Sequence, residues 1–233
     1  MLMRIALLGG SAAGFAWAQI QPIRSGVFRL IMLLAIAMGV LAFLSLVWKR
    51  KWMRGVSMLM IFGVVAFLLL PIRPYDRDQG VARYKSALAR YEQTPYVWGG
   101  ETRNGIDCSG LPRAALRNAL VQEGVRTLNG GLVRAAALHW WFDASARALA
   151  DGYRDYMLPL SIEGRIRDLD YSELLPGDVA ITESGVHCLV YFENNLWIQA
   201  DPEKGKVAFS DGRVSGNAWL NAPVRVYRWR ELQ

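Results

Sequence analysis

The stretch YVWGGETRNGIDCSG, residues 96–110, combines four glycines, a tyrosine and a tryptophan with one cysteine, Cys108. The chain has one further cysteine, Cys188, so a disulfide within the chain could form only between these two. The Cys108 thiol is therefore half of that disulfide, a small buried side chain, or a nucleophile. The residues that follow it help to distinguish these possibilities.

The sequence after Cys108, GLPRAALRNAL, predicts an α-helix, because its apolar residues recur at helical spacing. Pro112 suits the first turn, where a missing backbone N–H does no harm. A cysteine in that turn lies near unpaired N–H groups and the positive end of the helix dipole. Such an environment can lower a thiol pKa from about 8.5 to roughly 3.5–7.5, which favours a reactive thiolate.

A thiolate nucleophile needs a base, and the chain has two histidines. His139 lies in an apolar helical stretch, and we interpret it as structural. His187 lies in SGVHCLVYFENNLWIQAD, where β-branched and aromatic residues predict two strands joined by a tight turn. His187 is therefore the candidate base.

The length of this turn decides whether Gln199 can orient His187. A three-residue loop at 193–195 places residue 189 opposite Gln199, so that His187 and Gln199 share a face as diagonal neighbours about 7–8 Å apart. A two-residue loop would put them on opposite faces. With the longer loop, Gln199 could fix the imidazole tautomer, which is the orienting role in a Cys-His-polar triad.

Cys188 directly follows His187, so its side chain should point to the opposite face of the strand. If His187 faces the cleft, Cys188 faces the core, where a free cysteine packs as a small apolar residue. We therefore expect Cys108 and Cys188 both to be reduced.

Residues 1–75 form an apolar region without Asp or Glu. Two uncharged runs, at 30–48 and 56–72, approach the roughly 20 apolar residues that cross a bilayer. A buried helix of a soluble core is the alternative, and the lack of a polar face disfavours it. The weaker run at 5–20 is either a retained third span, which we favour, or a signal peptide cleaved after Ala18.

The basic residues predict the orientation of the chain in the membrane. Residues 49–55, KRKWMRG, carry four positive charges, which should keep this loop in the cytoplasm. Residues 76–233 then face the periplasm or the outer surface. Seven of the 27 basic residues precede residue 73, so the other 20 balance the 20 acidic residues, and the net charge of +7 does not indicate a nucleic-acid partner.

Residues 76–233 are long enough for one domain with its own core. Three blocks within it, YVWGGETRNGIDCSG, LLPGDVAI and GVHCLVYFENNLWIQA, resemble the NlpC-type cell-wall peptidases, a papain-like cysteine hydrolase family. The resemblance covers about residues 82–200. It implies an α+β papain-like domain, in which a nucleophile helix packs on an antiparallel sheet, after the N-terminal membrane-spanning helical region.

The resemblance also implies catalytic roles for three residues. Cys108 would be the nucleophile, His187 the general base and then acid, and Gln199 the residue that orients His187.

Three further residues would surround the reacting bond. Tyr96, together with the Cys108 N–H, would stabilise the oxyanion, and Asp107 and Ser109 would line the substrate-binding side. Alternatively, Tyr96, Asp107 and Ser109 serve only loop and cap chemistry.

The chain departs from compact members of this family in a longer segment at about 112–170, which we interpret as a helical insertion. We favour an extra helical layer in which Trp140, Trp141 and Phe142 make core contacts. A lid or wall of the substrate cleft is the other interpretation.

These features predict a membrane-anchored cysteine hydrolase that cuts an amide of the peptidoglycan stem peptide through a thioester, beside a γ-D-glutamyl residue. An amidase or acyltransferase on another amide or lipid, and a non-catalytic wall-binding module, are the alternatives. Its partners would be the stem peptide and the lipid bilayer. No cofactor and no metal are expected, because two cysteines eighty residues apart and two histidines lack a zinc-binding spacing.

Overall fold

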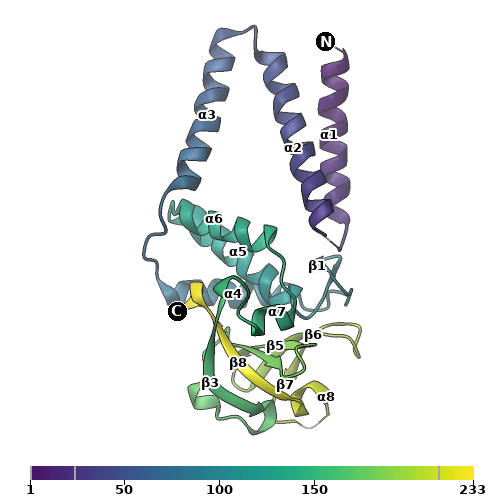
Figure 1. Ribbon diagram of the computed structural model, residues 1–233, viewed down its shortest axis with the longest axis vertical. Helices are drawn as coiled ribbons and strands as arrows, with labels where there is room; N and C mark the ends of the chain where they lie inside the picture. Colours follow the sequence, from purple (N-terminus) through teal and green to yellow (C-terminus); the bar gives the residue numbers. More distant parts are fainter. Residues whose placement is uncertain (1, 24, 215) are drawn as a thin grey trace.

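The computed structural model describes residues 2–23, 25–214 and 216–233, and it consists of a long helical region and an α+β domain (Figure 1). Three helices form the first part: α1 (Leu2–Ile20), α2 (Gly26–Val47) and α3 (Lys51–Leu69). α1 packs along α2, whereas α3 runs back from the tip of α2 to the domain and diverges from it.

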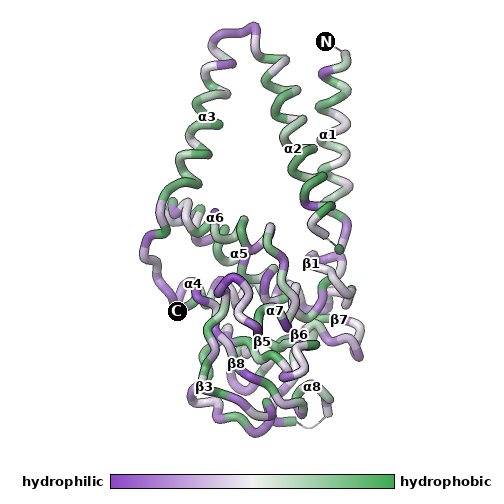
Figure 2. Tube along the Cα trace, in the orientation of Figure 1, coloured by the Kyte–Doolittle hydropathy of each residue, from purple (hydrophilic) through white to green (hydrophobic). Residues whose placement is uncertain are grey.

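The helices α2 and α3 contain most of the uncharged runs at 30–48 and 56–72 and are long and apolar enough to span a membrane. Within the described residues α1 does not meet this criterion, so a third span stays a prediction. No side chain of α3 is buried, and the apolar colour of both helices continues around them (Figure 2). A helix that is apolar and exposed on all sides needs an apolar environment.

The domain is built on a six-stranded antiparallel sheet with the strand order β3-β8-β4-β5-β6-β7. A small separate hairpin precedes the Cys108 segment. The strands are β1 (Glu101–Thr102) and β2 (Gly105–Ile106) of this hairpin, and β3 (Met157–Arg165), β4 (Val179–Thr182), β5 (Cys188–Glu193), β6 (Leu196–Asp201), β7 (Lys206–Asp211) and β8 (Pro223–Trp229) of the large sheet.

Helices cover one face of this sheet, and shorter turns cover the other. The helices of the domain are α4 (Arg77–Ala89), α5 (Gly110–Arg126), α6 (Gly130–Trp141), α7 (Ala146–Ala150) and α8 (Ala218–Asn221), with 3-10 turns at Tyr153–Asp155, Ile166–Asp168, Tyr171–Glu173 and Arg230–Leu232.

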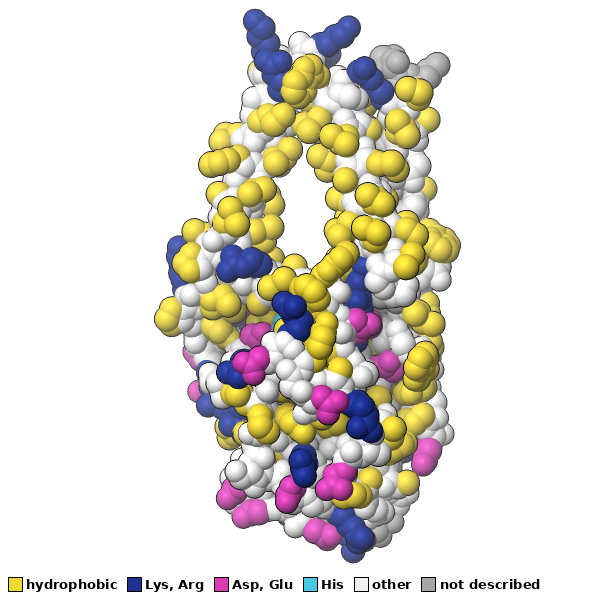
Figure 3. Space-filling view, in the orientation of Figure 1, with side chains coloured by type: hydrophobic (Ala, Val, Ile, Leu, Met, Phe, Trp, Pro, Cys, Tyr) yellow, Lys and Arg dark blue, Asp and Glu magenta, His cyan; other side chains and the backbone are white. Residues whose placement is uncertain are grey.

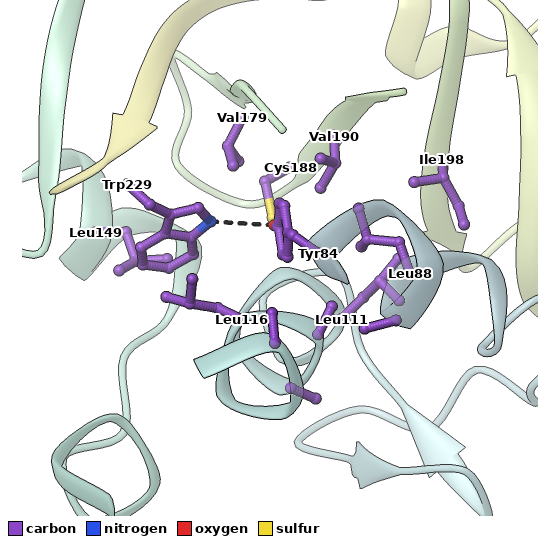
Figure 4. Packing of buried hydrophobic residues seen from close by; sticks show 14 of the residues in the cluster. Tyr84, Leu88, Leu111, Leu116, Leu149, Val179, Cys188, Val190, Ile198 and Trp229 are labelled. Carbon is purple, nitrogen blue, oxygen red and sulfur yellow. Dashed lines mark hydrogen bonds between the residues drawn. The ribbon is translucent and has the colours of Figure 1, made fainter. Parts of the chain in front are cut away.

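The main core lies between the sheet and helices α4 and α5 (Figure 4). Alternation along β5 decides which side chains enter it: Cys188 and Val190 point to the helices, and Leu189 and Tyr191 point to the opposite face. Cys188 is 1% exposed, so its expected place in the core is confirmed. The α+β class is also confirmed, because the helix that follows Cys108 packs on an antiparallel sheet.

The turn between β5 and β6 differs from the expected three-residue loop. It has two residues, Asn194 and Asn195, with φ values of 47° and 66°, the left-handed conformation that tight hairpin turns require. The strands nevertheless pair Val190 with Ile198, which is the predicted register. The turn is one residue shorter than expected, but a bulge at residues 191–193 adds one residue to β5, so the register is unchanged.

The predicted helical insertion at 112–170 is helical only in part. Residues 157–165 form the edge strand β3, which pairs with β8. Leu160 and Ile162 alternate with polar residues there, as in a strand with one face towards the core. Trp141 is 40% exposed, so the expected core contact is wrong for this residue.

A buried hydrogen bond in the main core allows a test of stability. Tyr84 is fully buried, and its hydroxyl accepts from Trp229 Nε1 at 3.0 Å (Figure 4). Tyr84→Phe leaves that N–H unpaired, so the free energy of unfolding should fall by about 1–3 kcal/mol. Thermal unfolding of the full chain in detergent measures the loss. Tyr153→Phe, at an exposed position, is the matched control, and equal shifts for both variants would contradict the assignment.

Candidate active site

Cys108 lies in the first turn of the helix that packs on the sheet. The hydrogen bond from Leu111 N–H to Asp107 O, at 3.0 Å, has the i to i−4 spacing of an α-helix, although regular α5 begins at Gly110. Among the described residues the Cys108 N–H has no acceptor, as is usual for an N–H at a helix start. The thiol is 8% exposed and lines a cleft.

The Asp107 carboxylate fixes the glycine-rich loop to this helix. Its Oδ2 accepts from Gly99 N–H at 2.8 Å, and its Oδ1 accepts from Gly110 N–H at 2.6 Å and from the Ser109 hydroxyl at 3.0 Å. A carboxylate that accepts from the N–H three residues further on caps the helix. Asp107 and Ser109 thus have structural contacts and also line the cleft, and their contact with substrate stays a prediction.

Two glycines of the quoted stretch are needed for this arrangement. Gly99 has φ of 74°, in the left-handed region where other residues are strained. A side chain at Gly110 would collide with the carbonyl oxygen of Gly100. These two positions let the loop approach the start of the helix closely enough for Asp107 to bind both ends.

His187 precedes β5, and Gln199 lies on β6 on the same face. Gln199 Oε1 is an acceptor only, so His187 Nε2 donates to it, at 2.6 Å. This bond leaves His187 Nδ1 as the proton acceptor. The imidazole also stacks on Trp219, with ring centroids 4.1 Å apart, so its orientation is fixed on two sides.

The imidazole is not among the groups that line the cleft. His187 is 1% exposed, whereas Val186 beside it is 62% exposed and places its carbonyl oxygen 3.7 Å from Cys108 Sγ. Cys108 is thus the member of the predicted triad that faces the cleft, and His187 and Gln199 lie behind it.

The two cysteines are both free and differ in their electrostatics. The Cys188 thiol and the His187 imidazole lower the pKa of the Cys108 thiol to about 5, against the effect of burial, which raises it. Interaction with Cys108 and burial raise the pKa of Cys188 well above its usual value. Cys188 Sγ donates to Cys108 O at 2.9 Å, so this second thiol supports the backbone under the first.

Tyr96 lines the same cleft as Cys108. Burial and the negative charges of Cys108 and Asp107 raise the pKa of its phenol to about 12. The phenol therefore stays protonated at neutral pH and can donate a hydrogen bond. Its predicted place at the oxyanion stays a prediction.

The cleft has a volume of about 500 Å³. Its walls include four residues that the sequence analysis did not assign to the site: Trp98, Arg113, Asp143 and Val186. Trp98 is 81% exposed. Trp98, Val186 and Arg113 lie within stretches that the sequence analysis quoted around Cys108 and His187, whereas Asp143 had no such signal. Within the described residues, no group of three His, Cys, Asp or Glu side chains could hold a metal ion.

A buried ion cluster joins this cleft to α2. The Glu101 carboxylate lies 2.7 Å from Arg29 of α2, 2.7 Å from Arg113 and 3.1 Å from Arg117 of α5. Burial raises the pKa of Glu101, but the three arginines outweigh it and lower the pKa to about 2. Asp143 completes the cluster, 2.6 Å from Arg113 and 3.5 Å from Arg29.

Comparison with known proteins identifies the class to which this cleft belongs. The family model of the NlpC/P60 family matches residues 93–228, which is more than half of the chain and includes every predicted site residue. The chain belongs to the NlpC/P60 family. The expected resemblance and the enzyme class that it implies, cysteine peptidase, are confirmed at the level of the family.

A curated relative is the "Probable endopeptidase NlpC" of Escherichia coli (strain K12), 26% identical over 133 residues. The match covers 54% of this chain and 64% of the relative. Solved structures with a weak likeness include the peptidoglycan hydrolase RipB from Mycobacterium tuberculosis (20% identity, 67% of this chain, 68% of that chain, TM-score 0.43) and NlpC2 from Trichomonas vaginalis (18%, 66%, 48%, 0.43). The family assignment rests on the sequence match.

The low pKa of Cys108 predicts how the thiol reacts with iodoacetamide. The thiolate forms as the pH rises through about 5, so labelling of the native chain should be close to its maximum at pH 7 and fall below pH 5. Cys188 should be labelled only after denaturation. Mass spectrometry of labelled peptides across pH 4–9 measures both rates, with Cys108→Ala as the control. A midpoint near pH 8–9, or labelling of native Cys188, would contradict the assignment.

Proposed function

We propose that the chain is a membrane-anchored cysteine hydrolase that cuts an amide bond in the stem peptides of peptidoglycan. The observation that carries the proposal is the Cys108 thiol, which lies at a helix start beside His187, has a pKa of about 5 and faces a cleft of about 500 Å³. Membership of the NlpC/P60 family and the likeness to the probable endopeptidase NlpC of Escherichia coli support cleavage of an amide bond within a peptide.

The first half of the reaction is acyl transfer to Cys108. With a pKa of about 5, the Cys108 thiol is ionised at neutral pH. His187 acts as the general base that receives the thiol proton. Cys108 Sγ attacks the amide carbonyl carbon, and the negative charge develops on the carbonyl oxygen. The C–N bond then breaks, the departing amine takes the proton from His187, and a thioester remains on Cys108.

The second half is hydrolysis of that thioester. His187 takes a proton from a water molecule, the hydroxide attacks the thioester carbonyl, and the Cys108 thiolate leaves. In both halves the Cys108 N–H and the Tyr96 hydroxyl donate to the oxyanion. Gln199 holds the imidazole so that Nδ1, rather than Nε2, exchanges the proton with Cys108.

The helices α2 and α3 would anchor the enzyme in the membrane. Lys49 and Arg50 lie in the turn that joins them, and Lys51 begins α3. Figure 3 shows basic side chains at the tip away from the domain. Trp48 and Trp52 are exposed beside them, as in an interfacial aromatic belt. The positive loop would stay in the cytoplasm, and the catalytic domain would face the periplasm or outer surface.

Stem-peptide hydrolysis by the purified full chain tests the catalytic assignments. Cys108→Ala should abolish turnover, and His187→Ala should reduce kcat by about 10²–10⁴-fold, because it removes the proton acceptor. Gln199→Ala should reduce kcat less, without changing KM, and should also slow iodoacetamide labelling of Cys108 at pH 6. Mass spectrometry of the products identifies the bond that is cut. Full activity of Gln199→Ala would remove this residue from the triad.

The orientation of the chain is tested by fusion to an enzyme that is active only outside the cytoplasm. A fusion after Gln233 should be active, because two spans return the chain to the outer side. The matched control, fused after Arg54, which lies between the two apolar runs near the start of α3, should be inactive. The reverse pattern would show that the domain faces the cytoplasm.

A further inference from the structure

Helix α6 begins against the end of α3. A side chain at Gly130 would collide with the carbonyl oxygen of Phe67, so the two helices approach backbone to backbone. Arg134 Nη1 donates to Leu68 O at 2.5 Å and to Leu70 O at 2.9 Å, which are carbonyls that the end of α3 leaves unpaired. The first turns of α6 are therefore fixed to the outer end of one proposed span.

The other end of α6 is fixed to the start of α2. Arg29 Nη1 donates to Trp141 O at 3.3 Å, and Arg29 Nη2 lies 3.5 Å from the Asp143 carboxylate. Arg29 is the last charge before the apolar run of α2 and is 1% exposed. The twelve residues of α6, about 18 Å long, thus run from the outer end of one proposed span to that of the other.

Beyond Arg134, which is bound to the end of α3, the side of α6 that faces away from α5 is apolar. Ala137, Leu138 and Trp141 are exposed, and their spacing places them on one face of the helix. Figure 3 shows apolar side chains around the opening between α2 and α3, with the domain below it. In a bilayer, lipid fills this opening. A short helix with an exposed apolar face and a tryptophan is suited to the membrane surface.

The cleft begins where α6 ends. Asp143, two residues after α6, lines the cleft and contacts Arg29. Arg113, on the cleft wall, is linked to Arg29 through Glu101. Two residues of the cleft wall, Asp143 and Arg113, therefore contact Arg29 directly or through Glu101, and Arg29 lies where α2 would enter the bilayer. Trp98, which is 81% exposed, lines the same cleft.

We propose that the cleft accepts an amide joined by a short tether to a lipid in the outer face of the same bilayer. This inference deepens the proposed hydrolase function and rests on it. The chemistry is unchanged: the acyl group passes to Cys108, the amine leaves with a proton, and water releases the acid. The lipid stays in the bilayer on whichever product carries the tether. Because the membrane surface lies beside the cleft, the reacting amide needs no long spacer.

The distance of the cleft from the bilayer is tested without turnover. Monobromobimane is attached to Cys108 of the full chain in nanodiscs of phosphatidylethanolamine and phosphatidylglycerol that contain a headgroup nitroxide lipid. The control is Val214→Cys in a Cys108→Ser background, at an exposed position between β7 and α8. Helix α8 lies at the end of the domain away from the proposed spans (Figure 1). Quenching should be at least threefold stronger at Cys108. Equal or weaker quenching at Cys108 would overturn the inference.

The substrate class is tested with one γ-D-glutamyl peptide in three forms: soluble, palmitoylated through a two-residue tether, and palmitoylated through a twenty-residue Gly-Ser tether. Both tethered forms gain from a raised local concentration, so their comparison isolates the height of the cleft above the bilayer. The short tether should be cut at least as fast as the long one. Cleavage of the long-tether form alone would overturn the inference.

Variants that place acidic residues on the apolar face of α6 test its role, and the same change at a distant exposed position is the matched control. Leu138→Glu with Trp141→Glu should slow cleavage of the short-tether peptide at least fivefold and leave the soluble peptide unchanged, and Val214→Glu should affect neither. If the soluble peptide is cut but the short-tether peptide is not, this inference fails and the hydrolase stands. If no form is cut although Cys108 is quenched, the proposed hydrolase function fails instead.

Discussion

The Glu101 carboxylate is buried among Arg29, Arg113 and Arg117 at distances of 2.7–3.1 Å, and the position of the site depends on this cluster. A buried charge is tolerated only when opposite charges and hydrogen bonds replace water around it, and removing one partner leaves the others uncompensated. The cluster draws its arginines from two parts of the chain, α2 and α5. It therefore fixes α2 to α5, the helix that follows Cys108, and one wall of the cleft to the N-terminal helical region.

The reactivity of Cys108 has two separate physical sources. Its place in a helix turn capped by Asp107 gives it an N–H for which the described part of the chain provides no acceptor, and such an N–H is suited to an oxyanion. Its neighbours, Cys188 and His187, lower its pKa although it is buried. The same strand supplies both neighbours, because consecutive side chains point to opposite faces: Cys188 enters the core under the Cys108 carbonyl, and His187 faces Gln199 and Trp219.

The segment between α5 and β4 adds helices and an edge strand to the central sheet and the helix that follows Cys108. Its helix α6 connects the outer ends of α2 and α3, and its next residues, at Asp143, form a wall of the cleft. Its edge strand β3 extends the sheet through β8. One segment thus extends the core, contacts both α2 and α3 and shapes the cleft, so the helical region and the α+β domain are one structural unit.

The sequence alone determined the features that depend on neighbours in the chain. Helical spacing after Cys108, alternation around Cys188 and the uncharged runs of α2 and α3 were all local patterns, and the three family blocks identified the fold. Only the tertiary structure decided how Gln199 meets His187, because a bulge in β5 compensated for the shorter turn. It also decided that Arg29 is buried against Glu101. A residue at the edge of an apolar run shows no sign of a carboxylate 72 positions away. Such contacts form between distant segments, and only packing of the whole chain brings them together.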